Sequence, residues 1–272
     1  MNNQILTGQI LEKKSFLCVG LDTDSSQLPP SLIGKPKAVF QFNKAIIDAT
    51  YTHTVAYKIN TAFYECDGIA GWQAMEQTAQ YIHQHHPNIF LIADAKRGDI
   101  GNTSRMYAKA FLQNMPFHAI TVAPYMGSDS IQPFLQVEHK YVIVLGLTSN
   151  QGSNDFQHLT LTNDKPLYQQ VIETVAGYGT PHNTMFVIGA TQAQNLQHIR
   201  SIIPHHFLLV PGVGAQGGRL ADVITYGANE HGGLLINASR SIIYASKHDD
   251  FAQAAAIEAA SMVAQMAPHF AR

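Results

Sequence analysis

The sequence contains few cysteines and few charged residues. Only two of its 272 residues are cysteines, Cys18 and Cys66, and they lack CxxC spacing, which argues against a disulfide scaffold or a cysteine zinc site. We expect both thiols to be inert packing residues. Charged residues make up 13% of the chain and the net charge is -2, so the composition does not favour binding to nucleic acid or to an anionic membrane.

The sequence also lacks targeting, membrane-spanning and metal-binding patterns. Met1 to Gln4 show no basic region followed by an apolar run, and no apolar run is long enough to cross a bilayer, which predicts a cytoplasmic protein. The 14 histidines do not show HExxH spacing. We interpret them as scattered surface residues and predict neither a metal nor a cofactor.

What the chain does contain is a regular alternation of short apolar runs and helical patterns. Eight runs have the length and composition of buried strands: 16–21, 54–60, 89–95, 119–123, 141–147, 185–190, 207–210 and 233–237. Helical periodicity separates most of them, at 38–52, 71–85, 104–115, 167–177, 192–203 and 218–226. Eight such units predict an α/β fold, a single (β/α)8 TIM barrel that spans residues 1–272 as one catalytic domain.

Polar or glycine-rich residues follow most of the predicted strands. In a barrel these segments converge on the carboxyl-terminal face, where active sites are built. The polar stretch 151–165 is weakly patterned, and we expect it to be a long loop near the site.

The most informative of these segments is Asp94-Ala95-Lys96-Arg97-Gly98-Asp99, which ends a predicted strand. Side chains alternate along a strand, so Asp94 and Lys96 share a face, and Asp99 lies just beyond. Burial of opposite charges is costly unless they pair closely. Charges placed here therefore either take part in a reaction or fix how neighbouring strands align. The alternative is a surface ion pair, with Asp99 or Asn102 as N-cap of a helix that starts near Thr103.

The segments after the seventh and eighth strands predict a phosphate site. They read Pro211-Gly212-Val213-Gly214-Ala215-Gln216-Gly217-Gly218 and Ser239-Arg240-Ser241. Glycines let backbone N–H groups approach an anion, and Arg240 offers a planar set of donors for phosphate. The alternatives are a tight turn for the glycines and a surface ion pair for Arg240.

With these residues identified, the chain resembles the orotidine 5'-phosphate decarboxylases of the longer branch of that family, over nearly all of the barrel. The signature Asp-x-Lys-Arg-x-Asp-Ile-x-x-Thr is matched in full by residues 94–103, and further matches are Asp22, Lys58, Ser149, Gln216 and Arg240. Two departures are modest: Gln151 stands where shorter members have proline, and Ser239 stands where they have glycine.

The resemblance implies conversion of orotidine 5'-phosphate to uridine 5'-phosphate and CO2 in pyrimidine biosynthesis, without metal or cofactor. Lys96 would be the proton donor, held by Asp94 in an alternating array with Lys58 and Asp99. Ribose would contact Asp22, the pyrimidine would contact Ser149 or its neighbour Asn150, and the phosphate would contact Gln216 and Arg240.

The resemblance further implies a homodimer in which Asp99 and Thr103 complete the partner's site. Two alternatives remain at this point. One is a magnesium-dependent sugar-phosphate decarboxylase or aldolase of the same superfamily, and the other is a non-catalytic nucleotide-phosphate binding protein on a decayed barrel.

Overall fold

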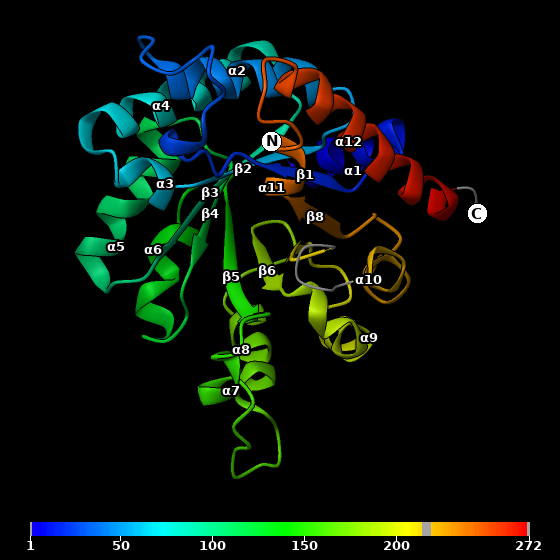
Figure 1. Cartoon of the computed structure of the whole chain (residues 1–272). Helices are drawn as coiled ribbons and strands as arrows, with labels where there is room; N and C mark the ends of the chain where they lie inside the picture. The colour runs from blue at the N-terminus through cyan, green and yellow to red at the C-terminus, as the bar shows by residue number, and fades with distance from the viewer. Residues whose placement is uncertain (1, 214–218, 271–272) are drawn as a thin grey trace.

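The computed structural model describes residues 2–213 and 219–270, and eight parallel strands in it close into a barrel in chain order. Figure 1 shows the strands at the centre with helices around them. The strands are β1 Leu17–Gly20, β2 Ala56–Asn60, β3 Phe90–Arg97, β4 Ala119–Val122, β5 Tyr141–Leu147, β6 Thr184–Ile188, β7 Leu208–Pro211 and β8 Leu234–Ala238. Each matches one of the predicted runs, so the predicted TIM barrel is confirmed.

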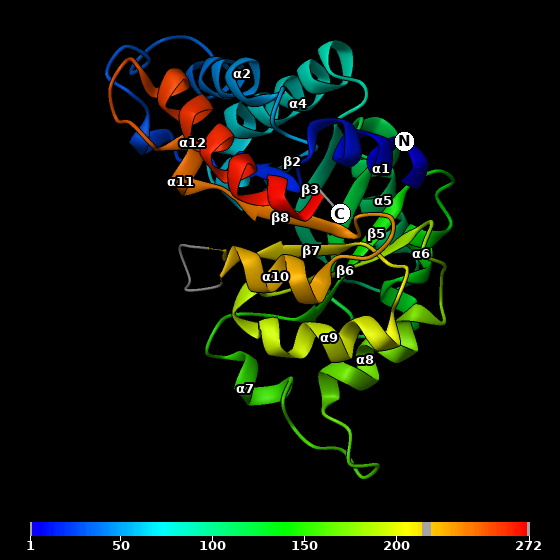
Figure 2. The ribbon, with the colours of Figure 1, turned by 90° about the vertical axis from the view of Figure 1, so that its right-hand side faces the viewer.

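Helices follow most strands and cover the outside of the barrel (Figure 2). The α-helices are α1 Asn3–Lys13, α2 Ala38–Thr50, α3 Ala62–Glu65, α4 Gly68–His85, α5 Gly101–Ala108, α6 Gln132–Leu135, α7 Ser153–Phe156, α8 Leu167–Ala176, α9 Ala193–Ile202, α10 Leu220–Gly227, α11 Arg240–Ile243 and α12 Phe251–Met266. A π-helical turn, η2 Lys109–Asn114, continues α5, and short 3-10 turns are η1 Ser25–Gln27, η3 Ser128–Ser130, η4 Ala190–Gln192 and η5 Ala267–Phe270.

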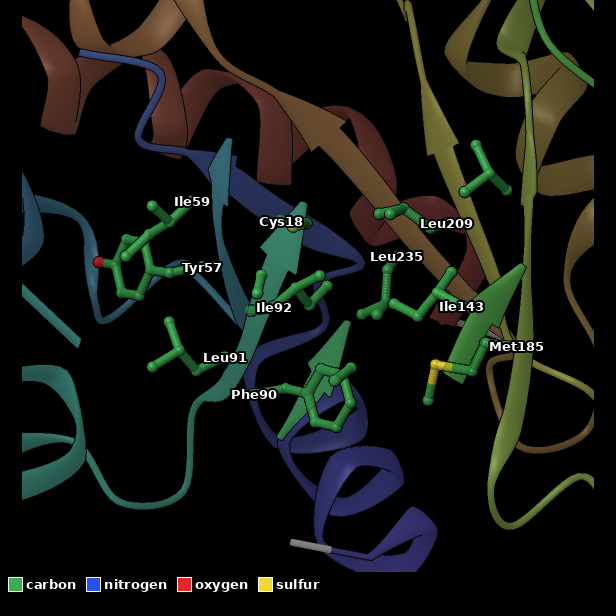
Figure 3. Close-up of a cluster of buried hydrophobic side chains, with 14 of the residues drawn as sticks. Cys18, Tyr57, Ile59, Phe90, Leu91, Ile92, Ile143, Met185, Leu209 and Leu235 are labelled. Carbon is green, nitrogen blue, oxygen red and sulfur yellow. The ribbon is translucent and has the colours of Figure 1, made fainter. Parts of the chain in front are cut away.

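The barrel interior is apolar at its lower levels. Inward and outward side chains alternate along each strand. In Figure 3, Tyr57, Ile59 and Leu91 lie together on one side of β2 and β3, apart from the group that contains Ile143, Met185, Leu209 and Leu235. All seven side chains are buried. Phe90, Ile92 and Asp94 alternate along β3 and face the same side of it. The charged residue Asp94 therefore follows directly after two buried apolar side chains.

Helix α1 covers the opposite end of the barrel from the predicted site. Its Leu6 and Ile10 are buried, and Asn3 accepts a hydrogen bond from the Tyr141 hydroxyl at 2.7 Å and donates to the Pro181 carbonyl at 2.9 Å. These contacts lie at the amino-terminal ends of β5 and β6. The predicted site residues Asp94 and Lys96 lie at the other end of the barrel, near the carboxyl end of β3.

Two local expectations and one alternative are wrong. The stretch 151–165 is not a continuous loop, because Ser153–Phe156 form the short helix α7. The residue before α5 is Ile100, and the Asp99 carboxylate accepts a hydrogen bond from the Ile100 amide at 2.7 Å, so neither Asp99 nor Asn102 is the N-cap. Cys18 is buried as expected, whereas Cys66 is exposed and is not a packing residue.

Candidate active site

A cavity of about 230 Å3 opens at the carboxyl ends of the strands. Most of its lining comes from β2, β3, β7 and β8 and the segments that follow them, because carboxyl ends of parallel strands meet at one face of a barrel. Its charged and polar lining side chains are Asp22, Lys58, Asn60, Asp94, Lys96, Asn237, Ser239, Arg240 and Ser241. Five of the residues predicted from the sequence therefore share one cavity: Asp22, Lys58, Asp94, Lys96 and Arg240.

Four of these residues, which we name the charged array, form a continuous chain of ion pairs. Asp22 Oδ1 lies 3.0 Å from Lys58 Nζ, Lys58 Nζ lies 3.1 Å from Asp94 Oδ2, and Asp94 Oδ1 lies 2.7 Å from Lys96 Nζ. Each charge thus neighbours an opposite one. The array spans β1, β2 and β3, which are adjacent strands of the barrel.

Burial differs along the array. The side chain of Lys58 is 5% exposed and that of Asp94 is 10% exposed, whereas that of Lys96 is 50% exposed. Lys58 is therefore a buried ammonium held between two carboxylates at the wall of the cavity. Lys96 is the cation that faces the open cavity.

The pairing keeps the buried groups ionised. Burial by itself would lower the pKa of Lys58, but the carboxylates of Asp22 and Asp94 outweigh this effect and raise it. Burial alone would raise the pKa of Asp94, whereas Lys58 and Lys96 hold that pKa at about 2. At neutral pH, Asp94 is a carboxylate and Lys58 an ammonium.

Lys96 has an unusual backbone conformation. Its φ is 46°, in the left-handed region that non-glycine residues rarely adopt, at a cost of about 1–2 kcal/mol. The ladder between β3 and β4 shifts register between Ala93 and Arg97, around this residue. Such strain is common at functional sites, where the surrounding contacts hold it in place.

The other end of the array is fixed by β8. The Ser239 hydroxyl contacts Asp22 Oδ2 at 2.8 Å and donates to the Gly20 carbonyl at 2.9 Å. A Cβ atom at Gly20 would lie 2.7 Å from this hydroxyl oxygen, so the close approach requires glycine. Ser239 stands where shorter members of the resembling family have glycine, and in the structure its hydroxyl contacts the Asp22 carboxylate.

Asp99 and Thr103 lie apart from this array within one chain. Asp99 is partly exposed beyond the end of β3, and Thr103 is exposed in the first turn of α5. The carboxylate that pairs with Lys58 in addition to Asp94 is Asp22. Within the described part of one chain, the carboxylates that pair with Lys58 are therefore Asp22 and Asp94, and the expectation that Asp99 joins the array from a partner subunit stays a prediction.

Of the remaining predicted substrate contacts among the described residues, Arg240 lines the cavity and Ser149 does not. Arg240 is exposed at the start of α11 and lines the cavity next to Gly212 and Val213. Gln216 lies outside the described residues. The Ser149 hydroxyl is buried and has no hydrogen-bond partner among the residues that the structure describes.

Several polar residues around the array were given no individual role from the sequence. Thr121 on β4 contacts both Asp94 and Lys96, and Asn60 and Asn237 line the cavity from the ends of β2 and β8. Arg97 forms an ion pair with Glu65 at the end of α3. Thr121 carries a usable signal, because a threonine within an apolar strand at the level of Asp94 is a polar group that needs a partner.

Across residues 2–213 and 219–270, no cluster of three or more His, Cys, Asp or Glu side chains could hold a metal ion. The two carboxylates of the charged array, Asp22 and Asp94, are bridged by the Lys58 ammonium group. The expectation of surface histidines is wrong at two positions, since His118 and His206 are buried. Within the same described segments, no helix is long and apolar enough to cross a membrane.

Comparison with known proteins assigns the chain to a family. Residues 15–257 match the family described as "Orotidine 5'-phosphate decarboxylase / HUMPS family". A protein of Christiangramia forsetii named orotidine 5'-phosphate decarboxylase is 57% identical, over 98% of this chain and 98% of that protein. A protein of Flavobacterium johnsoniae with the same name is 55% identical, over 98% of this chain and 97% of that protein.

Solved structures agree with this assignment. A structure titled as a putative orotidine-monophosphate decarboxylase of Toxoplasma gondii has a TM-score of 0.84 and 33% identity, and covers 97% of this chain and 98% of its own. The orotidine-monophosphate decarboxylase of Leishmania donovani has a TM-score of 0.78 and 35% identity, with coverage of 97% and 99%. The chain therefore belongs to the orotidine 5'-phosphate decarboxylase family.

Proposed function

We propose that the chain decarboxylates orotidine 5'-phosphate without a metal ion, and that Lys96 donates the proton that replaces the carboxylate. The chain is a carboxy-lyase that forms uridine 5'-phosphate and CO2 in pyrimidine biosynthesis, as its relatives' names and the family match support. The observation that carries the residue assignment is the charged array, which ends in a half-exposed ammonium at the cavity.

The chemistry explains why such an array is useful. Loss of CO2 from C6 of the pyrimidine leaves the bonding electron pair on C6, in the plane of the ring, where no carbonyl can delocalise it. An ammonium beside C6 stabilises that charge and then transfers a proton to it. Lys96 is left as a neutral amine, which solvent reprotonates.

The array supports this role because its charges are fixed before substrate arrives. Asp94 holds the Lys96 ammonium at 2.7 Å and is itself held by buried Lys58 at 3.1 Å. Preorganised charges need no reorientation during the reaction, which is the main source of electrostatic catalysis. Asp94 would lie near the substrate carboxylate.

The same geometry supports a reaction without a metal. Asp22 and Asp94 both contact Lys58 Nζ, so the position where a divalent cation would bridge the two carboxylates already holds an ammonium. Magnesium would have to displace a lysine that is 5% exposed and doubly paired. This favours orotidine 5'-phosphate decarboxylation over a magnesium-dependent reaction of a sugar phosphate.

The substrate would lie along the cavity with its pyrimidine at Lys96 and its phosphate at Arg240. We assign the phosphate to Arg240 and Gln216, a ribose hydroxyl to Asp22 and the pyrimidine amide to Ser149. The unused hydrogen-bonding capacity of the buried Ser149 hydroxyl supports the last assignment. Binding energy at the remote phosphate then serves to position the reacting carbon.

We further propose a homodimer in which Asp99 and Thr103 complete the partner's site. Four large apolar side chains, Ile100, Met106, Tyr125 and Met126, are exposed on the segments that follow β3 and β4, the first of which also carries Asp99. Exposed apolar groups of this kind are typical of a protein interface. Each subunit would be one catalytic domain of residues 1–272.

We also propose that the protein acts in the cytoplasm, without nucleic acid or membrane partners. Free thiols support this location, because Cys18 and Cys66 are both unpaired and reduced thiols are typical of that compartment.

A spectrophotometric assay of orotidine 5'-phosphate consumption tests the proposal. Purified protein should convert the substrate at the same rate with and without EDTA, and bound metal should be absent by elemental analysis. Turnover that EDTA abolishes and magnesium restores would refute the metal-free mechanism. Binding of uridine 5'-phosphate without any turnover of orotidine 5'-phosphate would instead indicate a non-catalytic binding protein.

A further inference from the structure

The buried hydroxyl of Thr121 contacts both the Asp94 carboxylate, which pairs with Lys96, and the backbone amide of Lys96 itself. Thr121 lies in the middle of β4 and is fully buried. Its hydroxyl donates to Asp94 Oδ1 at 2.9 Å and accepts from the Lys96 amide at 2.9 Å. The same Asp94 oxygen receives the Lys96 ammonium at 2.7 Å. Hydroxyl and ammonium therefore converge on one oxygen.

The Thr121 hydroxyl takes the place of a backbone hydrogen-bond partner between β3 and β4. Strands β3 and β4 pair at Ala93 with Ile120 and next at Arg97 with Val122, so three residues of β3 lie opposite Thr121 alone. A β-bulge of this kind leaves backbone groups without their usual partner. The Lys96 amide finds that partner in the Thr121 side chain.

The bulge also places Lys96 in its left-handed conformation, with φ at 46°. A non-glycine residue keeps such a conformation only where its surroundings hold it. The hydrogen bond to the Lys96 amide is a direct restraint on this backbone. A hydroxyl is suited to the position because it accepts from the amide and donates to the carboxylate at the same time.

We propose that Thr121 is a positioning residue, which fixes the Lys96 backbone and the Asp94 carboxylate together so that the ammonium is aimed at the reacting carbon. This inference rests on the proposed function of Lys96. A merely structural role, in which the threonine only fills space and satisfies buried polar groups, predicts a loss of stability without a specific effect on turnover.

The test compares two variants at this position. Thr121→Val keeps the volume and removes the hydroxyl, and Thr121→Ser keeps the hydroxyl. We expect kcat for orotidine 5'-phosphate to fall about 100-fold in the valine variant, since displacement of a reacting group by about 1 Å costs that much. KM and the Kd of uridine 5'-phosphate should change less than about threefold, because Arg240 is untouched. The serine variant should keep kcat within about fivefold of wild type.

Thr184→Val is the matched control. Thr184 is also a fully buried strand threonine, but it lies on β6 and contacts Asn183 at 3.2 Å, away from the cavity. The Thr184→Val variant should have a lower unfolding midpoint than wild type and an unchanged kcat. If the valine variant at position 121 does not fold by circular dichroism, Thr121→Ala removes the hydroxyl without placing a methyl group against the carboxylate, and the same expectations apply.

The outcomes distinguish a failure of the role of Thr121 from a failure of the proposed function. Wild-type kcat in a folded variant without the hydroxyl, or an equal loss in the serine and valine variants, would overturn the role of Thr121 alone. A loss confined to KM would overturn it as well. An inactive wild-type protein would overturn the proposed function and this inference with it.

Discussion

Replacement of Lys58 by methionine should be among the most destabilising single changes in this protein. The methionine side chain has a similar length but no charge, so Asp22 and Asp94 lose the cation that they share at 3.0 and 3.1 Å. Removal of one partner from a buried ion pair leaves an uncompensated charge and costs about 3–5 kcal/mol. Because Asp94 keeps its contact with Lys96, we expect a loss near the lower end, about 3 kcal/mol in the free energy of unfolding.

The loss of unfolding free energy in Lys58→Met should also depend on pH. The pKa of Asp94 is about 2 in the folded protein against an ordinary value of 3.8, a difference that corresponds to about 2 kcal/mol. A depressed carboxyl pKa stabilises the fold above about pH 4, and this stability is lost as the pH falls toward 2. Without Lys58 the pKa of Asp94 should rise, so the difference between wild type and variant should shrink below pH 4.

Urea unfolding followed by circular dichroism at pH 7 and at pH 3.5 measures both effects, at one protein concentration because an oligomer's stability depends on it. Lys44→Met is the control, since Lys44 and Asp48 form a closer pair at 2.6 Å but are 45% and 41% exposed. Such a surface pair contributes about 0–1 kcal/mol. A Lys58→Met variant that loses no more than this control, or a loss that is the same at both pH values, would refute the electrostatic reasoning.

Three further predictions concern activity and ligand binding. Lys96→Ala should lower kcat by at least about 1000-fold, because it removes the stabilising charge and the proton donor together, and retained turnover in a folded variant would contradict the mechanism. Arg240→Ala should weaken binding of uridine 5'-phosphate by about 10- to 100-fold in calorimetry and leave uridine unchanged, whereas equal losses for both would exclude a phosphate contact. Mixed subunits of Lys96→Ala and Asp99→Ala should recover about a quarter of wild-type activity, since half the dimers are mixed and half their sites intact. No recovery after subunit exchange shown by mass spectrometry would place Asp99 in its own chain's site.

The sequence by itself determined the barrel and the position of its active face. Eight apolar runs with the composition of buried strands alternate with helical periodicity, and this pattern requires only local information. The alternation of side chains along a strand also predicted that Asp94 and Lys96 lie close together, and their side chains meet at 2.7 Å, although the bulge between Ala93 and Arg97 interrupts the regular alternation. Helices α1 and α12 were not predicted from periodicity, and α12 is rich in alanine, so its apolar stripe is weak.

Only the tertiary structure decided which groups complete the charged array. Ser239 meets Asp22 because β8 pairs with β1 when the barrel closes, across a separation of 217 residues that no local pattern encodes. Thr121 reaches Asp94 and Lys96 because a register shift between β3 and β4 opens the ladder there. Asp22 reaches Lys58 because it follows β1, the neighbour of β2, whereas Asp99 lies on a loop beyond β3. Pairing of distant charges depends on strand order and register, which are fixed by packing of the whole barrel rather than by any segment of the chain.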